Sequence, residues 1–417
     1  MELKKYRLKE IATIWNGATP SSAHPEYYDG DIVWLTPKDL SDQKSKYIFN
    51  GERMISKEGF NSCSTHLLPK GTILMSSRAP IGLLAISGCE CCTNQGFKNI
   101  IVDSKQCDAE FLFYYLKFNM KRIVGLGSGT TFLEVSKASL ENFEIELPSL
   151  SRQQRIAHVL SSIDQKIALN RDINRNLEAM ARQLYDYWFV QFDFPDENGR
   201  PYKSSGGKMV WNEKLKREIP EGWCDGKLID IASITMGQSP DGSSYNEQGE
   251  GVLFYQGSTD FGIRFPSVRQ FTTAPTRFAK QGDILMSVRA PVGTTNIANA
   301  DCCIGRGLAA INSKIGSITH LFHIIQDLKT AFDMRNDAGT TFGSITKDDL
   351  YGLLVLIPNP TVVSQYEHLC ASIFYRQMII GNEIDSLEKQ RDELLPLLMN
   401  GQVSVMPSEV NCDLSHD

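Results

Sequence analysis

The feature that most constrains the fold of this 417-residue chain is an internal repeat. Three blocks of the first half recur in the second half in the same order: 8–20 (LKEIATIWNGATP) with 228–240 (LIDIASITMGQSP), 73–82 (ILMSSRAPIG) with 284–293 (ILMSVRAPVG), and Gly-Thr-Thr-Phe at 129–132 with 339–342. Their offsets drift only from 220 to 210 residues. The sequence therefore predicts two copies of one unit of roughly 200 residues.

The first part of each copy is expected to be rich in β-structure. The runs ILMSS and ILMSV are short, apolar and closed by proline and glycine, which is typical of a strand followed by a turn. The blocks at 8–20 and 228–240 end in the same way, with Gly17 and Pro20 or Gly237 and Pro240.

Each copy is expected to close with a long helix. Between Pro148 and Pro195 there is neither glycine nor proline, and apolar residues recur every three or four positions. Capping boxes predict helix starts at Ser151-Arg152-Gln153-Gln154 and at Ser364-Gln365-Tyr366-Glu367. Pro396 and Gly401 are expected to break the second helix, and Gly381 to disturb its straightness.

The narrow apolar seams of the two helices run from Ile156 to Trp188 and from Leu369 to Leu398. Two such seams are buried most simply against each other, which predicts an antiparallel coiled coil. The alternative is that each helix packs only on its own β-rich part. Polar residues within the seams, Asn170 and Asn174 among them, would either fix the register of the pair or face a partner protein.

The ten cysteines raise the question of a metal site, because Cys89-Glu90-Cys91-Cys92 contains a C-x-x-C. A structural zinc needs four ligands, and a second pair at suitable spacing is missing. The sequence favours reduced cysteines packed as small apolar side chains. The N-terminus lacks the apolar core of a signal peptide and the chain has no run of about 18 apolar residues, so a cytoplasmic protein is expected.

Motifs of self-contained enzymes are absent from the sequence. There is no phosphate-binding G-x-x-x-x-G-K-[ST] loop, no dinucleotide fingerprint after a strand, and no Asn-Pro-Pro-aromatic motif of amino-methyltransferases. The chain is therefore expected to be non-catalytic and to hold no cofactor or metal.

The net charge of −6 argues at first against nucleic acid as a partner, but the charge is unevenly distributed. Residues 351–417 carry 3 basic and 9 acidic side chains, which alone accounts for −6. Residues 43–89 carry 6 basic and 2 acidic side chains, and so do residues 261–310. Because local potential governs binding to a polyanion, these two basic segments predict DNA binding.

The chain resembles the specificity (S) subunits of type I restriction–modification systems. The resemblance rests on the repeated ILMS-x-RAP-x-G and Gly-Thr-Thr-Phe blocks and on the linker DYWFVQFDFPDENGRPYKSSGGKM followed by IPEGW. It implies an α+β fold in which two β-rich target-recognition domains are joined by two long antiparallel helices in a coiled coil, with an internal pseudo-two-fold repeat. The implied boundaries are target-recognition domain 1 at 1–149, a spacer helix at 150–190, a linker at 191–220, target-recognition domain 2 at 221–361, a second spacer helix at 362–402 and a tail at 403–417.

The resemblance also implies a function. Each domain would bind one half of a bipartite, asymmetric site in double-stranded DNA, and the helices would bind two modification (methyltransferase) subunits. Those partners would supply S-adenosylmethionine for adenine-N6 methylation. Restriction (translocase and nuclease) subunits would add ATP- and Mg²⁺-dependent cleavage.

Comparison of the copies sorts the candidate DNA contacts. Positions shared by the copies are expected to be scaffold or phosphate contacts, because phosphate contacts position a protein without reading sequence. They are Arg78 with Arg289 and Thr130 with Thr340, and the basic residues Lys70 and Lys280 are further candidate DNA contacts. The alternatives are a locally paired turn residue for the arginines and local side-chain bonding within a turn for the threonines.

Base-reading residues are expected where the copies diverge. Two loops follow equivalent strands and offer polar side chains: Thr36, Lys38 and Asp39 in the first copy, and Gln256, Ser258 and Thr259 in the second. Gln95 stands opposite Arg306, and Gln suits adenine whereas Arg suits guanine. Competing hypotheses are a free-standing sequence-specific regulator or scaffold, and a self-contained nuclease or methyltransferase.

Overall fold

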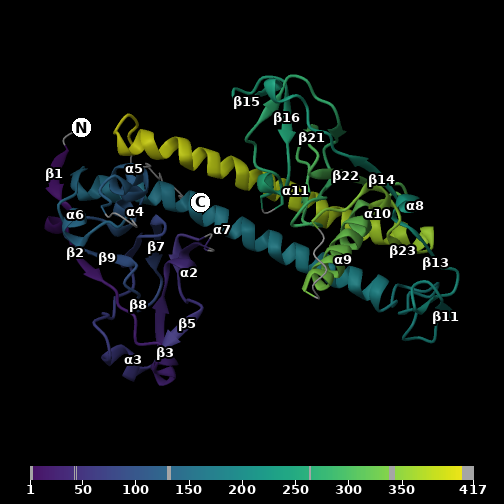
Figure 1. Cartoon of the computed structure of the whole chain (residues 1–417), viewed down its shortest axis with the longest axis horizontal. Coiled ribbons are helices and arrows are strands. Elements are labelled where there is room, and N and C mark those ends of the chain that lie inside the picture. Colours follow the sequence, from purple (N-terminus) through teal and green to yellow (C-terminus); the bar gives the residue numbers. More distant parts are fainter. Residues whose placement is uncertain are drawn as a thin grey trace, which may run out of the picture. The chain divides into compact units, whose positions relative to one another are not determined.

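The computed structural model describes residues 3–405 apart from 42, 44, 129–132, 263 and 338–342 (Figure 1). It divides into unit 1, Met1–Leu169 with Asp385–Asp417, and unit 2, Asn170–Ile384. Each unit combines a β-rich part with one segment of each long helix. The mixed helix and sheet content confirms the expected α+β class.

The described residues of unit 1 form three sheets. The two-stranded sheet pairs β1 (Lys4–Arg7) with β10 (Glu144–Leu147) in antiparallel fashion. The five-stranded sheet has the order β2 (Ala12–Asn16), β9 (Phe97–Val102), β6 (Ile73–Ser77), β7 (Ile81–Ser87), β4 (Tyr47–Ile48). The three-stranded sheet has the order β5 (Arg53–Ile55), β3 (Tyr28–Leu35), β8 (Cys92–Thr93).

Within its described residues, unit 2 repeats most of these strands in the same order along the chain, but its main sheet has four strands and its second sheet five. The pair β13 (Cys224–Lys227) and β23 (Leu354–Ile357) is again antiparallel. The main sheet has the order β14 (Ala232–Met236), β22 (Leu308–Ser313), β19 (Ile284–Ser287), β20 (Thr295–Ile297). The second sheet has the order β15 (Tyr245–Asn246), β17 (Phe271–Thr272), β16 (Val252–Tyr255), β21 (Cys302–Ile304), β18 (Phe278–Ala279). Unit 2 adds the hairpin β11 (Met209–Asn212) and β12 (Arg217–Pro220).

Short helices complete each unit. Unit 1 has α1 (Leu8–Ile11), α2 (Pro37–Ser41), α3 (Lys57–Asn61), α4 (Ala109–Phe118), α5 (Met120–Val124) and α6 (Lys137–Glu141). Unit 2 has α8 (Leu228–Ile231), α9 (Ile318–Asp337) and α10 (Lys347–Tyr351). The aromatic face of α4 and the histidine-bearing face of α9 lie in the cores of their units.

The two long helices begin earlier than the capping boxes predict. Helix α7 spans Leu150–Tyr185 and continues as a π-helix through Val190, and α11 spans Pro360–Met399. The predicted box at Ser364 is wrong because Asn359 caps α11, its side chain accepting a hydrogen bond from the Thr361 N–H at 2.9 Å. Pro360 is the first residue of α11. Proline suits this position because the N–H groups of the first helical turn have no acceptor within the helix, so the missing proline N–H costs no hydrogen bond. The box at Ser151 is wrong too, since α7 already begins at Leu150 and Ser151 lies within the helix.

Helix α11 is not broken at Pro396, but it does end just before Gly401, as the sequence predicts, and Gly401 has a φ of 68°. It continues through Pro396 to Met399, and it remains helical at Gly381. Gly381 is required by packing, because a Cβ there would lie 2.2 Å from the ring of Phe265. The predicted seam is also partly wrong, since Leu369 is 49% exposed while Tyr366 and Cys370 beside it are buried.

Segments of the two helices are hydrogen-bonded within each unit. In unit 2 the Asn170 side-chain amide donates to Glu383 at 2.9 Å, and the Tyr366 hydroxyl lies 3.5 Å from the Ala181 carbonyl. Asn170 comes before Ala181 in α7, whereas its partner Glu383 comes after Tyr366 in α11. The two segments therefore run in opposite directions. In unit 1, Arg391 of α11 pairs with Asp164 of α7 at 3.1 Å.

The linker and the cysteines fill space in the cores. Phe192 and Phe194 of the linker are buried against Trp223, whereas Trp211 is 57% exposed. The four equivalent cysteines, Cys91, Cys92, Cys302 and Cys303, are fully buried and reduced, which confirms their apolar packing. Within the described residues, no helix is long and apolar enough to cross a bilayer.

Candidate nucleic-acid interface

Four loops of unit 1 meet at one edge of its sheets, and we call residues 17–20, 36–39, 78–80 and 94–96 the loop edge of unit 1. Backbone hydrogen bonds hold the loops together. The Ala18 N–H donates to Thr93 at 2.9 Å, Asn94 to Leu35 at 3.0 Å, and Ser77 to Gly96 at 2.8 Å.

Unit 2 repeats this arrangement at residues 237–240, 256–260, 289–291 and 305–307, the loop edge of unit 2. Gln238 donates to Ile304 at 3.0 Å, Gly305 to Tyr255 at 2.8 Å, and Val288 to Gly307 at 2.9 Å. Every donor and acceptor is the repeat equivalent of the corresponding residue in unit 1. The two loop edges therefore share one backbone design.

The close approach of the loops depends on one glycine in each unit. A Cβ on Gly17 would lie 2.1 Å from the Asn94 carbonyl oxygen, and a Cβ on Gly237 would lie 2.1 Å from the Gly305 carbonyl oxygen. Both distances are far inside van der Waals contact, so only glycine fits. The parallel pairing of β3 with β8 and of β16 with β21 brings the remaining loops to the same place.

Of the two arginines shared by the copies, Arg78 directly follows β6 and Arg289 lies two residues after β19. In each turn a serine hydroxyl, of Ser76 or Ser287, donates to the carbonyl of the following proline and accepts from the N–H of Leu83 or Thr294. Arg289 is exposed, whereas Arg78 is half-buried.

The surroundings of the two arginines differ in charge. Partial burial acts to raise the pKa of Glu134, but the hydrogen bond and charge of Lys98, followed by the charge of Arg78, hold that pKa below its usual range. The position equivalent to Glu134 is Ser344, which bridges Arg289 through the backbone. Arg78 therefore lies beside a carboxylate, whereas the residue at the equivalent position beside Arg289 is a serine.

The predicted base-reading loop of unit 1 is ordered by an aspartate. One Asp39 oxygen accepts from the Thr36 N–H at 2.7 Å and from the Thr36 hydroxyl, and the other accepts from the Glu52 N–H at 2.7 Å. The structure thus assigns Asp39 a structural role in capping α2. Lys38 is exposed, with its Nζ 2.7 Å from Glu52, and borders a shallow pocket of about 410 Å³.

The predicted loop of unit 2 is ordered by a different residue. Asp260 is buried, accepts from the Gln256 N–H at 2.9 Å and pairs with Arg269 at 3.3 Å. This leaves the Gln256 and Thr259 side chains exposed and Ser258 half-buried.

The divergent pair Gln95 and Arg306 lies at equivalent loop tips, and both side chains are exposed. The Thr19 hydroxyl donates to the Gln95 side chain, and the Arg306 N–H donates to the Ser239 hydroxyl at 3.2 Å. The sequence reasoning missed Thr19 and Ser239 as supports of these tips. The signal was present, because they are equivalent hydroxyl residues in the repeated block that ends at Pro20 and Pro240.

Not every predicted residue joins the loop edges. Lys70 and Lys280 are exposed but precede β6 and β19, whereas Arg78 and Arg289 follow these strands, so the lysines lie at the opposite end. Thr130 and Thr340 lie outside the described residues. The residues that follow them do reach the loop edges, since the Val135 N–H donates to Ser77 and the Ile345 N–H to Val288.

Two cations of the basic segments face the interior. Lys46 retains 5% of its side-chain exposure, and Arg264 is stacked on Phe322 and Phe374. Summing charges along the sequence therefore overestimates the basic surface of each unit.

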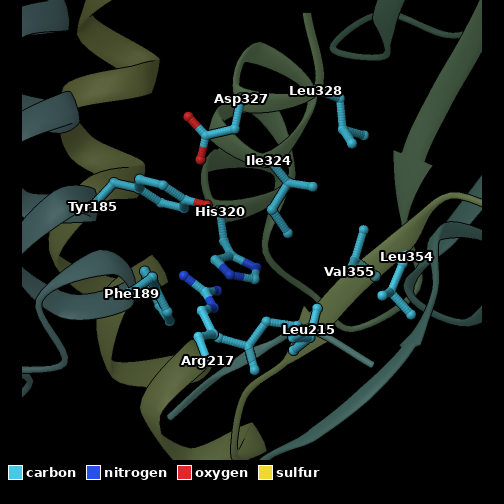
Figure 2. A pocket seen from close by; sticks show the side chains of 11 residues that line it. Tyr185, Phe189, Leu215, Arg217, His320, Ile324, Asp327, Leu328, Leu354 and Val355 are labelled. Carbon is cyan, nitrogen blue, oxygen red and sulfur yellow. The ribbon is translucent and has the colours of Figure 1, made fainter. Parts of the chain in front are cut away.

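Figure 2 shows a different kind of site, a pocket of about 370 Å³ within unit 2. Tyr185 and Phe189, Arg217, His320 with Asp327, and Val355 line it from separate elements. None of these residues belongs to the loop edge. Among the residues that the structure describes, no group of three or more His, Cys, Asp or Glu side chains could hold a metal ion.

Comparisons with known proteins point in one direction. A family model for the type I restriction modification DNA specificity domain matches residues 1–179. The type I restriction enzyme MjaIX specificity subunit of Methanocaldococcus jannaschii is 31% identical over 418 residues, covering 96% of this chain and 93% of that protein. The HindI specificity subunit of Haemophilus influenzae is 23% identical over 363 residues, covering 70% and 77%. The crystal structure of a type I restriction–modification S subunit from M. genitalium superposes with a TM-score of 0.61 at 16% identity, covering 95% and 96%.

Proposed function

The chain belongs to the specificity subunits of type I restriction enzymes, and on this premise we propose that it recognises a bipartite, asymmetric DNA site for a type I restriction–modification complex. One observation carries the proposal. The loop edges of units 1 and 2 share their backbone hydrogen bonds but present different exposed side chains, Gln95 in one and Arg306 in the other. The two loop edges would thus dock on DNA with the same backbone geometry but present different side chains to it.

This combination suits the reading of two unlike half-sites. A shared backbone presents both loop edges to DNA in the same orientation, and the shared Arg78 and Arg289 contact phosphate. The divergent tips address base edges, where glutamine pairs bidentately with adenine and arginine with guanine. A protein with an internal pseudo-two-fold axis would then bind half-sites on opposite strands, as symmetric dimers do at palindromes.

The two long helices form the spacer between the recognition domains. We assign them to an antiparallel coiled coil, supported by the opposite directions of the α7 and α11 segments in unit 2. Buried Asn170 and Asn174 suit a role in fixing the register of the pair.

We assign DNA methylation and DNA cleavage to partner subunits and not to this chain. Two modification subunits bind the helices and supply S-adenosylmethionine for adenine-N6 methylation, and restriction subunits supply ATP- and Mg²⁺-dependent translocation and cleavage. The chain itself is a non-catalytic, cytoplasmic protein in this assignment.

The test is co-expression of the chain with the modification subunit encoded beside it, followed by purification and methylome sequencing of the host. We expect a stable complex and methylated adenines in one split target. A chain that binds DNA tightly alone and never retains a modification subunit is a free-standing regulator, and methylation by the chain alone makes it an enzyme.

A further inference from the structure

Lys46 is a buried cation that connects the β-rich part of unit 1 to its helices. It lies just before β4, and its carbonyl accepts from the Ile86 N–H at 2.8 Å. Its Nζ donates to the Ser161 hydroxyl of α7 at 2.8 Å and lies 3.2 Å from Glu110 of α4. The side chain therefore crosses from the sheet into the helical layer.

The partners of Lys46 are themselves bonded to the helices. Ser161 and Tyr47 both donate to Glu110, and these bonds and Lys46 lower the pKa of Glu110 although its partial burial acts to raise it. Tyr114 of α4 donates to Asp164 of α7, which pairs with Arg391 of α11. One network thus joins the segment that carries Lys46 to α4, α7 and α11.

Arg264 is the equivalent residue of unit 2. Its carbonyl accepts from the Ile297 N–H at 2.9 Å, and Ile297 is the repeat equivalent of Ile86. Its guanidinium lies 4.9 Å from the ring of Phe374 on α11 and 5.7 Å from that of Phe322 on α9. Burial lowers the pKa of Arg264 to about 10, so the group is charged at neutral pH. The next residue, Phe265, fills the notch at Gly381.

Each buried cation is the last residue of a chain segment whose first residue lies in the loop edge. The segment of unit 1 runs from Thr36, after β3, to Lys46, and that of unit 2 runs from Gln256, after β16, to Arg264. The first end of each segment is fixed by the parallel strand pair, and the second end is fixed on the helices by the cation.

Stability alone does not explain a charge at these places. Replacing a buried charge and its partners with apolar side chains is often neutral or stabilising, so stability alone does not require a cation at either position. Lys46 is bonded to polar groups and Arg264 lies on aromatic rings, yet the two cations occupy equivalent positions. What they share is that each attaches its chain segment to the helices.

We propose that Lys46 and Arg264 are positioning residues that anchor, on the helices, the chain that follows the base-reading loops 36–39 and 256–260, each for its own half-site. The inference rests on the proposed function. It assigns sequence discrimination in one half of the target to a side chain that faces away from DNA.

The experiment uses the complex with modification subunits and a panel of duplexes with single base-pair changes in either half of the methylated target. Lys46→Met and Arg264→Met keep the length of the side chain and remove its charge. We expect each variant to lose at least tenfold of its discrimination in one half only, and the two variants to affect opposite halves. Lys46→Arg and Arg264→Lys should restore most of it.

Two matched variants separate positioning from stability. Leu140→Ala in unit 1 and Leu350→Ala in unit 2 remove buried, repeat-equivalent apolar side chains that contact neither cation, and should lower the melting temperature while both halves keep their discrimination. Equal loss in both halves, or unchanged discrimination in Lys46→Met and Arg264→Met, would overturn the inference. A wild-type complex without any sequence discrimination would instead refute the proposed function.

Discussion

In unit 1 the cation that enters the helical layer is bonded to a carboxylate and a hydroxyl, whereas in unit 2 it lies on two phenyl rings. The same contrast recurs elsewhere. Lys98 and Glu134 pair near the loop edge of unit 1, where unit 2 has Ala309 and Ser344. The backbone hydrogen bonds around these positions are equivalent in the two units. After duplication, backbone geometry was thus retained while the side chains that fill it changed.

The largest effect is expected from a change at the backbone contact that both units share. Gly17→Ala and Gly237→Ala place a methyl group 2.1 Å from a carbonyl oxygen, so the loops must separate. We expect each variant to lose roughly 3–5 kcal/mol of unfolding free energy, as severe overpacking does. Urea unfolding measures this loss.

Gly257→Ala is the matched control, because its Cβ would meet nothing within 4 Å and its φ of −169° is extended. It should unfold like the wild type. If Gly17→Ala is harmless while Gly237→Ala is not, the two loop edges are not built alike.

A second difference between the units is their response to acid. Burial lowers the pKa of His320 to about 3, with His323 adding to it, and lowers that of His323 to about 4. The equivalent residues of unit 1 are Phe111 and Tyr114. Because these histidines protonate more readily when unfolded, their contribution is complete above about pH 6.5 and is lost as pH falls below it.

We therefore expect His320→Phe with His323→Tyr to remove acid sensitivity. Each histidine should lower the unfolding free energy by about 2 kcal/mol between pH 7.5 and pH 5.0. Urea midpoints of the wild type and the double variant at both pH values measure this. Equal pH dependence of the two proteins would contradict the assignment of acid sensitivity to these histidines.

Sequence reasoning succeeds where an inference depends on equivalence between the copies. The offsets place Gln95 opposite Arg306 and Arg78 opposite Arg289, and the hydrogen bonds of the two loop edges follow the same equivalences. The repeat could be read because it needs only the order and spacing of residues.

It fails where an inference depends on which way a side chain faces. Lys46 and Arg264 count as basic surface in any sum over the sequence, yet both point into the helical layer. Glu367 completes a capping-box pattern but accepts from Thr319, 48 residues earlier in the chain. Such long-range partners leave no local signal.

The loop tips allow a test of whether the two differing residues, Arg306 and Gln95, read bases. Arg306→Ala should cost about 1–3 kcal/mol of binding free energy at one base pair of one half-site and relax the preference there. Gln95→Ala should do the same at one base pair of the other half. Competition binding with a set of single base-pair changes measures both. Uniform weakening across all duplexes would reassign either residue to the phosphate backbone.

The smallest expected effect concerns the arginines that the units share. Arg289→Ala should weaken binding to matched and mismatched DNA alike, and should reduce the slope of log K against log salt by about one, since each neutralised phosphate contributes about 0.9. Arg78→Ala should reduce the slope less, because the neighbouring Glu134 already offsets part of the Arg78 charge.

Binding of the complex to its target between low and moderate salt measures both slopes, and Glu134→Gln tests the reason. Removal of the carboxylate frees the charge of Arg78, so the slope should steepen in Glu134→Gln, and Arg78→Ala in that background should then match Arg289→Ala. Ser344→Ala at the equivalent position of unit 2 should leave the slope unchanged. If Arg78→Ala and Arg289→Ala already change the slope equally in the wild-type background, Glu134 does not distinguish the two loop edges electrostatically, and the units differ at DNA only through their loop tips.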